Sequence, residues 1–117
     1  MYKRSEKVAE AIHEEISGLL VKGLKDPRVG FATLTSVKVT DDLRQATVYY
    51  TVMGDETARR DAQAGLESAR GYLRSEIGKS LRLRHVPDLL FRYDESIDYG
   101  MRIDSLLREI GGEGSHD

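Results

Sequence analysis

A row of residues near the middle of the chain has the types and the spacing needed to bind phosphate. This basic ladder consists of Arg70, Arg74, Gly78 and Arg82, each four positions from the last. Residues four apart lie on neighbouring turns of an α-helix, so the ladder would line one helical face. Guanidinium groups bind phosphate oxygens in pairs, and a glycine among them lets another backbone come close. Lys79 and Arg84 add positive charge, so residues 69–85 hold five Lys or Arg residues against one acid.

The ladder requires a long helix, and residues 55–84 have the pattern of one. Apolar side chains recur at steps of three and four residues and predict one buried stripe: Ala62, Leu66, Ala69, Leu73, Ile77 and Leu81. Asp55 precedes this run as a candidate N-cap. The arginines of the ladder lie one step around the helix from the stripe. We therefore expect them to be exposed and removable without unfolding the protein.

This helix is too long to stay straight inside one small domain. About thirty residues rising ~1.5 Å each would reach roughly 45 Å. A compact domain of this length is only roughly 35 Å across. Gly71 is the weakest helix former near the middle, so we predict a bend at residues 69–71, with Ala69 and Gly71 setting the kink.

The flanking segments supply the rest of a small α+β domain. Their apolar patterns predict five further elements: helices at 4–24 and 97–110, and strands at 31–40, 46–53 and 89–93. Ser5 is the candidate cap of the first helix, and Gly23 ends it. Simple alternation in the first strand places Leu34 on the face opposite Val37 and Val39.

These elements predict one two-layer domain. The order is helix, strand, strand, bent helix pair, strand, helix, and helices on one face of a three-stranded sheet would bury every apolar stripe. The third strand follows a long helical crossover, so it can join a neighbour in parallel. We expect a single domain over residues 1–111 and a flexible tail over residues 112–117.

Composition places the chain among charged globular proteins. It is 39% hydrophobic and 32% charged, and it has no cysteine, so it has no disulfide framework and no thiolate chemistry. No apolar run approaches the ~20 residues of a membrane span, and the first residues do not read as a secretory signal. We therefore expect a cytoplasmic protein without a membrane partner.

The net charge of −2 argues against a nucleic-acid binder, but its distribution weakens that argument. Residues 88–117 hold eight acids against three bases, whereas residues 69–85 are basic. The field that matters for binding is the one near the contact. A local basic face on a mildly acidic protein can therefore still bind phosphate.

The sequence gives little support to catalysis or metal binding. Paired carboxylates at 41–42 and 94–95 fall in turns, where Asp is expected anyway. His85 and Asp88 flank Pro87, and two candidates do not make a metal site. Neither an activated nucleophile nor a phosphate-binding loop is found. We expect no enzyme, no catalytic residue, no metal, no cofactor and no small-molecule substrate.

Small domains with this order of elements include the KH fold, in which a GxxG turn between two helices clamps nucleotide backbone. Here the bend at residues 69–71 is one residue short of that motif, and the glycines at 111–114 follow the last helix. An arginine at the bend, followed by further basic residues on the helix, suits phosphate contact and shape recognition rather than sequence-specific recognition of nucleobases. On charge alone, a solvated basic helix face remains the alternative.

The chain resembles the ribosome-binding factor A family of bacteria over about residues 2–110. The matching pieces are residues 26–28, 37–46, 69–71, 81–84, 86–89 with Phe91, and 100–103 with 106–107. Their order and spacing together are specific, and the Ala-x-Gly kink in place of GxxG is the most telling piece.

The resemblance implies a type II KH-like fold without catalytic activity. It implies a late assembly factor of the small (30S) ribosomal subunit that acts on the 16S rRNA precursor and aids its processing. Family members bind the free subunit rather than the joined ribosome, near the decoding region and the 5′-terminal helix of the RNA, and support growth in the cold. We expect a monomer.

The phosphate contacts are expected from the basic residues of the long helix and the loop that follows it. The candidate RNA-binding residues are Arg70, Arg74, Gly78, Lys79, Arg82 and Arg84, with Arg28 and Lys38 as further candidates. Two alternatives stay open. One is a free-standing KH-like module for single-stranded RNA, and the other is a protein-interaction module whose acidic last helix is the contact surface.

Overall fold

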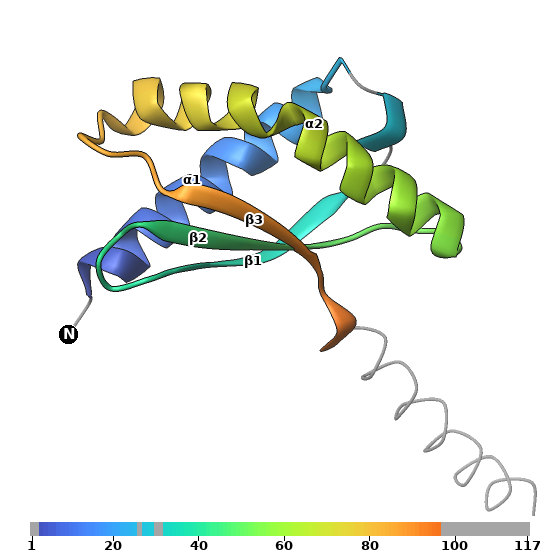
Figure 1. The fold of residues 1–117 in the computed structure, drawn as a ribbon, viewed down its shortest axis with the longest axis horizontal. Helices are drawn as coiled ribbons and strands as arrows, with labels where there is room; N and C mark the ends of the chain where they lie inside the picture. The colour runs from blue at the N-terminus through green and yellow to red at the C-terminus, as the bar shows by residue number, and fades with distance from the viewer. Residues whose placement is uncertain (1–2, 26, 30–31, 97–117) are drawn as a thin grey trace, which may run out of the picture.

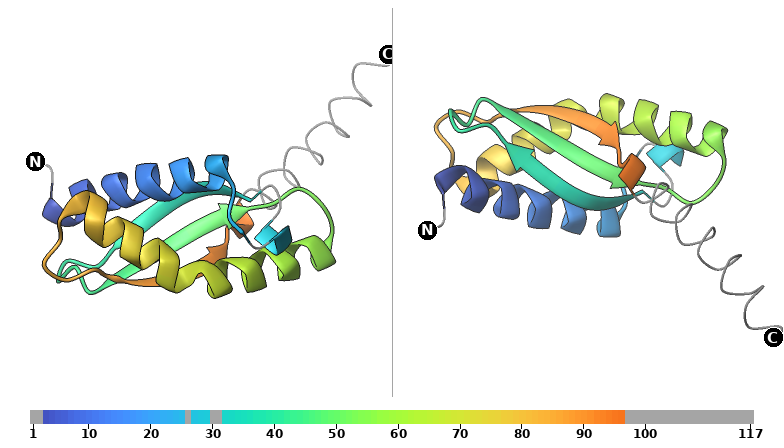
Figure 2. Two further views of the ribbon diagram at one scale, coloured as in Figure 1. Left: turned by 90° about the horizontal axis from the view of Figure 1, so that it is seen from above. Right: turned by 90° about the horizontal axis from the view of Figure 1, so that it is seen from below.

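A three-stranded sheet with two helices on one of its faces makes up the described part of the chain (Figures 1 and 2). The structure, a computed structural model, describes residues 3–25, 27–29 and 32–96. The elements in chain order are α1 (Arg4–Lys22), the 3-10 helix η1 (Pro27–Val29), β1 (Thr33–Val39), β2 (Gln45–Thr51), α2 (Glu56–Leu81) and β3 (Asp88–Tyr93). The α+β prediction is confirmed, while the predicted helix at 97–110 lies outside the described residues.

The sheet has the order β1-β2-β3, and its pairing brings distant segments to one end. β1 and β2 are antiparallel, whereas β3 runs parallel to β2 with Gln45 opposite Asp88. Parallel pairing puts the beginning of β3 beside the beginning of β2. The α2–β3 loop (residues 82–87) therefore lies next to the β1–β2 turn (residues 40–44). We call this end of the molecule the turn end; α1 also begins there, where the Ser5 hydroxyl lies 3.5 Å from the Asp41 carboxylate.

A β-bulge in β1 changes which side chains face the helices. Leu34 pairs with Tyr50 and Ser36 with Tyr49, so Thr35 is an extra residue in the ladder. The extra residue reverses the alternation. Leu34, which is 7% exposed, therefore points to the same face as the half-buried Val37 and Val39. The prediction that Leu34 lies on the opposite face was wrong, because simple alternation does not anticipate a bulge.

The core lies between the two helices and the inner face of the sheet. The predicted stripe of α2 is confirmed: Ala62, Leu66, Leu73 and Ile77 are fully buried, and Ala69 and Leu81 pack against them partly buried. Ile12 and Ile16 of α1 are fully buried in the same hydrophobic cluster. Burying each large aliphatic side chain contributes about 1.5–3 kcal/mol, so this layer holds the elements in place.

Local chemistry explains where the helices begin and end. The Asp55 carboxylate accepts a hydrogen bond from the Ala58 N–H at 3.0 Å, which confirms the predicted N-cap of α2. Gly23, with φ at 92°, ends α1 as predicted. The cap predicted for α1 was wrong. Lys3 is the N-cap, and Ser5 lies inside the helix, where it is buried.

α2 is one helix of 26 residues rather than two helices joined by a turn. Figure 1 shows that its axis nevertheless changes direction near the middle. That Ala69 and Gly71 set this bend stays a prediction. A Cβ built on Gly71 would meet nothing within 4 Å, whereas one on Gly65 would come within 2.8 Å of the Val29 backbone nitrogen. The tight contact along α2 is therefore at Gly65, against η1.

Candidate nucleic-acid interface

The middle of the basic ladder lies against the chain itself rather than open to solvent. A Cβ on Gly78 would come within 2.9 Å of the Val86 side chain, so this glycine lets the α2–β3 loop approach the helix. Arg74, one turn earlier, contacts the same loop. The close approach expected at Gly78 is therefore made by the protein's own loop.

Arg74 holds the end of the α2–β3 loop through two nitrogens of its guanidinium group. Its Nε donates to the Pro87 carbonyl at 3.2 Å, and one terminal nitrogen donates to the Val86 carbonyl at 3.0 Å. The same nitrogen lies 3.5 Å from the Asp88 carboxylate. The Arg74 side chain is only 40% exposed. The expectation that Arg74 is freely exposed was wrong, because the loop folds back over its helical face.

Arg70 is also engaged within the protein. Its guanidinium pairs with the Glu67 carboxylate, and its side chain is 40% exposed. The Glu67 carboxylate in turn accepts a hydrogen bond from the Gln63 amide at 2.9 Å. Among the residues described, the buried Nε of Arg70 has no hydrogen-bond partner. Arg70 can therefore offer only part of its guanidinium to a ligand.

The end of α2 and the following loop carry the exposed members of the predicted set. Lys79 is 73% exposed, with Glu76 at 4.0 Å. Arg82 and Arg84 are exposed as well. Arg82 is the C-cap of α2 in the left-handed conformation, with φ at 51°, a region that residues other than Gly and Asn rarely adopt. These three side chains are available to a partner.

The structure places the two further candidates away from this group. Arg28 is an exposed residue of η1, near Gly65. Lys38 is exposed on β1, and its ammonium lies 5.8 Å from the centre of the Tyr49 ring, on the sheet face that α1 and α2 leave open (Figure 2). Neither belongs to the end of α2 or to the loop that follows it.

An open cleft at the turn end brings the predicted Arg84 together with Arg4 and Arg44, which sequence reasoning missed. Its volume is about 640 Å³, and its rim includes Arg4 from α1, Arg44 from the β1–β2 turn, and Arg84 and His85 from the α2–β3 loop. The apolar side chains of Leu43 and Leu83 also line it. Positions 4, 44 and 84 are too far apart in the sequence for any helix or strand periodicity to connect them. The signal that could have located them is topological: each adjoins the end of an element that the parallel pairing of β3 brings together.

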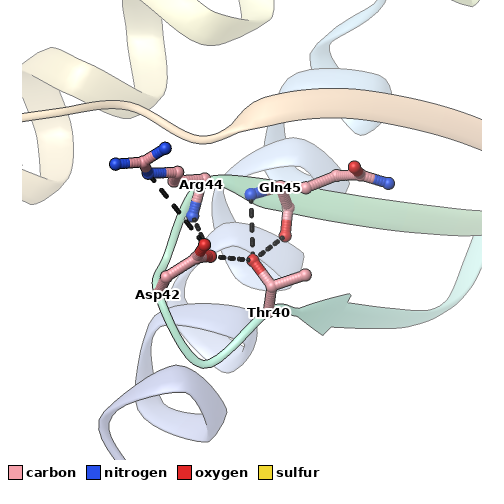
Figure 3. Close-up of polar contacts among 4 residues, drawn as sticks. All are labelled: Thr40, Asp42, Arg44 and Gln45. Atoms are coloured by element: carbon pink, nitrogen blue, oxygen red, sulfur yellow. Dashed lines mark hydrogen bonds and ion pairs between the residues drawn. The ribbon is translucent and has the colours of Figure 1, made fainter.

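The β1–β2 turn that forms one wall of this cleft is held by its own polar groups (Figure 3). The Thr40 hydroxyl donates to the Asp42 carboxylate at 2.6 Å, which in turn accepts the Arg44 N–H at 3.1 Å. The hydrogen bond from the Thr40 hydroxyl is the largest of the effects that lower the pKa of the Asp42 carboxyl. Asp42 therefore serves the turn, as expected of a turn carboxylate.

Asp94 makes folding stability depend on pH in the acid range. Hydrogen bonds from the Ser96 hydroxyl, and next from the Thr35 hydroxyl, lower the pKa of the Asp94 carboxyl below 3.8. A carboxyl whose pKa is lower in the folded than in the unfolded chain adds stability above pH 3.8, and this is lost as the pH falls through the folded-state value.

We expect Thr35→Val, which removes one of these donors, to make the free energy of unfolding fall less steeply below pH 3.8. Urea unfolding on both sides of that pH measures the effect. Thr35→Ser keeps the hydroxyl and is the control. Equal pH dependence in Thr35→Val and the parent would contradict this role of Asp94.

Other kinds of site find no support in the part of the chain that the structure describes. Within residues 3–25, 27–29 and 32–96, no three His, Cys, Asp or Glu side chains gather as a metal site would require. No described helix has the length and apolarity needed to cross a membrane. What the geometry presents is a basic end, with arginines from three separate elements.

Comparisons with known proteins all identify the same family. The model of the family "Ribosome-binding factor A" matches residues 4–107. Ribosome-binding factor A of Geobacter metallireducens is 64% identical over 118 residues, covering 100% of both chains. That of Geobacter sulfurreducens is 66% identical over 117 residues, covering 100% of this chain and 99% of the relative.

Coordinates of two proteins of this name support the same fold. The crystal structure of ribosome-binding factor A from Thermus thermophilus superposes with a TM-score of 0.65 at 21% identity, covering 76% of this chain and 94% of that one. A second comparison is a homology model of the Thermus thermophilus factor fitted into a cryo-EM map of a 30S–ribosome-binding factor A complex. Its TM-score is 0.58 at 25% identity, and it covers 79% of this chain and 92% of that one.

Proposed function

This chain belongs to the ribosome-binding factor A family, and from that premise we propose that it binds the small ribosomal subunit through its RNA. The observation that carries the proposal is identity of 64% or more with curated members along the whole chain. The similarity to coordinates fitted into a 30S complex supports it. The protein would act as a cytoplasmic monomer on the free 30S subunit, late in its maturation and in support of growth in the cold.

The proposed action is to hold a folding intermediate of the RNA rather than to catalyse a reaction. The finer assignment is to the 16S rRNA precursor near its 5′-terminal helix, where a bound protein would aid processing by limiting which conformations the RNA adopts. Lys79, Arg82 and Arg84 support this action because their charges are exposed at the end of α2 and in the loop that follows it. Contacts to phosphate position a protein on RNA by shape and charge.

Co-sedimentation tests the proposed function directly. The protein is expected to travel with free 30S subunits and to be absent from joined ribosomes in the same gradient. The gradient should be repeated with precursor subunits, which carry unprocessed 16S rRNA. Equal amounts of the protein on free subunits and on joined ribosomes would contradict the proposal, as would its absence from both.

The dependence of 30S binding on salt concentration tests whether the exposed basic residues at the end of α2 contact phosphates. Each phosphate contact that is lost should lower the slope of log affinity against log salt by roughly 0.7 to 0.9. We therefore expect Lys79→Gln with Arg82→Gln to flatten the slope for 30S binding by about twice that amount. Exposed substitutions of this kind should change stability by within ~0.5 kcal/mol, which a melting curve checks. A parental slope in this variant would show that the end of α2 is only a solvated surface.

A further inference from the structure

We propose that the cleft at the turn end holds the phosphate backbone of the RNA, with Arg44, Arg84 and Arg4 contacting it from three sides. This inference rests on the proposed function and deepens it. It moves the main RNA contact from the face of α2 to the end of the molecule. All three arginines lie outside α2, and two of them, Arg4 and Arg44, also lie outside the segment 55–84 that the sequence pattern predicts as one helix.

The charges around the cleft leave a positive surplus. The two acids that line it, Asp42 and Asp88, are both engaged within the protein: Asp42 by the turn and by Arg44, whose Nε lies 4.0 Å from its carboxylate, and Asp88 by Arg74 at 3.5 Å. The Arg44 side chain is nevertheless 87% exposed, so its remaining nitrogens can reach a ligand. Among the described residues, Arg4 and Arg84 form no ion pair. The planar fork of arginine matches phosphate oxygens in pairs, so several arginines around one cleft suit a chain of phosphates.

Both walls of the cleft are held in place before any ligand arrives. The Asp88 N–H donates to the Arg44 carbonyl at 2.8 Å and ties the beginning of β3 to the turn. On the other side, Arg74 holds the carbonyls of Val86 and Pro87. A preformed site avoids the entropy cost of ordering loops on binding. Arg74 and Gly78 of the basic ladder would thus serve RNA binding by shaping the wall that carries Arg84.

RNA is the occupant that these features fit best. Phosphates recur at every nucleotide, so neighbouring arginines can each find one. The apolar lining made by Leu43, Leu83 and Val86 suits the ribose and base edges that accompany them. An acidic protein segment is the competing occupant, and the experiment below separates the two.

The test compares the double variant Arg44→Gln with Arg84→Gln against a matched control, Arg60→Gln. Arg60 is 79% exposed and pairs with Glu56 near the start of α2, far from the cleft. The probes are free 30S subunits and protein-free 16S rRNA, each at several salt concentrations. The double variant should bind both about tenfold more weakly. Its salt slope should fall by roughly 0.7 to 0.9 for each arginine.

The control should bind within about twofold of the parent, and all variants should melt alike, since the Arg44 side chain is 87% exposed. Parental affinity and slope in the double variant would overturn the cleft as the site and leave 30S binding by the parent intact. A loss on 30S subunits with unchanged binding to 16S rRNA would overturn RNA as the occupant in favour of an acidic protein segment. Failure of the parent to bind either probe would overturn the function and the cleft together.

Discussion

Arg74→Ala is expected to lower the free energy of unfolding by about 1.5–3 kcal/mol, the range for hydrogen bonds made by charged groups. The guanidinium donates to the carbonyls of Val86 and Pro87 and neighbours the Asp88 carboxylate. Removing it leaves two carbonyls at the α2–β3 loop without their donor. Because that loop carries Arg84, binding to 30S subunits should weaken as well. Urea unfolding and co-sedimentation measure the two effects.

Two further variants separate a structural role of Arg74 from a direct contact with RNA. Lys79→Ala, which removes an exposed base from the same helix, should change stability by within ~0.5 kcal/mol. Arg74→Lys keeps the charge but loses the planar fork. If Arg74 acts by holding the loop, Arg74→Lys should be destabilised nearly as much as Arg74→Ala. Normal stability of Arg74→Lys and Arg74→Ala, with weak RNA binding of Arg74→Ala alone, would instead indicate a phosphate contact.

Gly65→Ala and Gly71→Ala are expected to change stability in opposite directions, although both introduce the same methyl group into α2. At Gly65 the new Cβ would lie 2.7 Å from the Val29 side chain and 2.8 Å from its backbone nitrogen. Backbone cannot step aside as a side-chain end can, and overpacking costs about 1–3 kcal/mol. The gain in helix propensity, at most about 1 kcal/mol, offsets only part of this.

At Gly71 the new methyl group meets open space, so Gly71→Ala should raise the free energy of unfolding by up to ~1 kcal/mol. Thermal and urea unfolding of the two variants against the parent provide the comparison. Equal gains in both would show that η1 moves freely away from α2. A loss of stability in Gly71→Ala would instead indicate that the bend of α2 depends on the freedom of this glycine.

Much of the fold could be predicted from local patterns. The apolar repeat of α2, the Asp55 cap and the glycine that ends α1 all describe interactions between residues close in sequence. The two-layer arrangement followed from counting apolar faces that must be covered. The β-bulge at Thr35, which puts Leu34 on the same face as Val37 and Val39, could not be predicted, because a bulge depends on how β1 pairs with β2. The cap at Ser5 failed for a similar reason, since the Ser5 side chain contacts Asp41 across the turn end.

The candidate site was predicted only in part. Lys79, Arg82 and Arg84 are exposed at the end of α2 and in the loop that follows it, as the charge pattern suggested. The spacing that defined the basic ladder correctly placed Arg74 and Gly78 on one helical face. It could not show that the α2–β3 loop returns over that face, because periodicity describes a helix without its neighbours.

The sequence by itself determined the class of the fold, the buried stripes, the basic character of residues 69–85 and the resemblance to a family of ribosome-binding proteins. These depend on composition, on periodicity and on the order of short motifs. Only the tertiary structure decided which basic side chains are exposed to solvent and which form hydrogen bonds and ion pairs within the protein. The reason is the parallel pairing of β3 with β2, which places the α2–β3 loop beside the β1–β2 turn. That contact engages Arg74 and brings Arg4, Arg44 and Arg84 around one cleft.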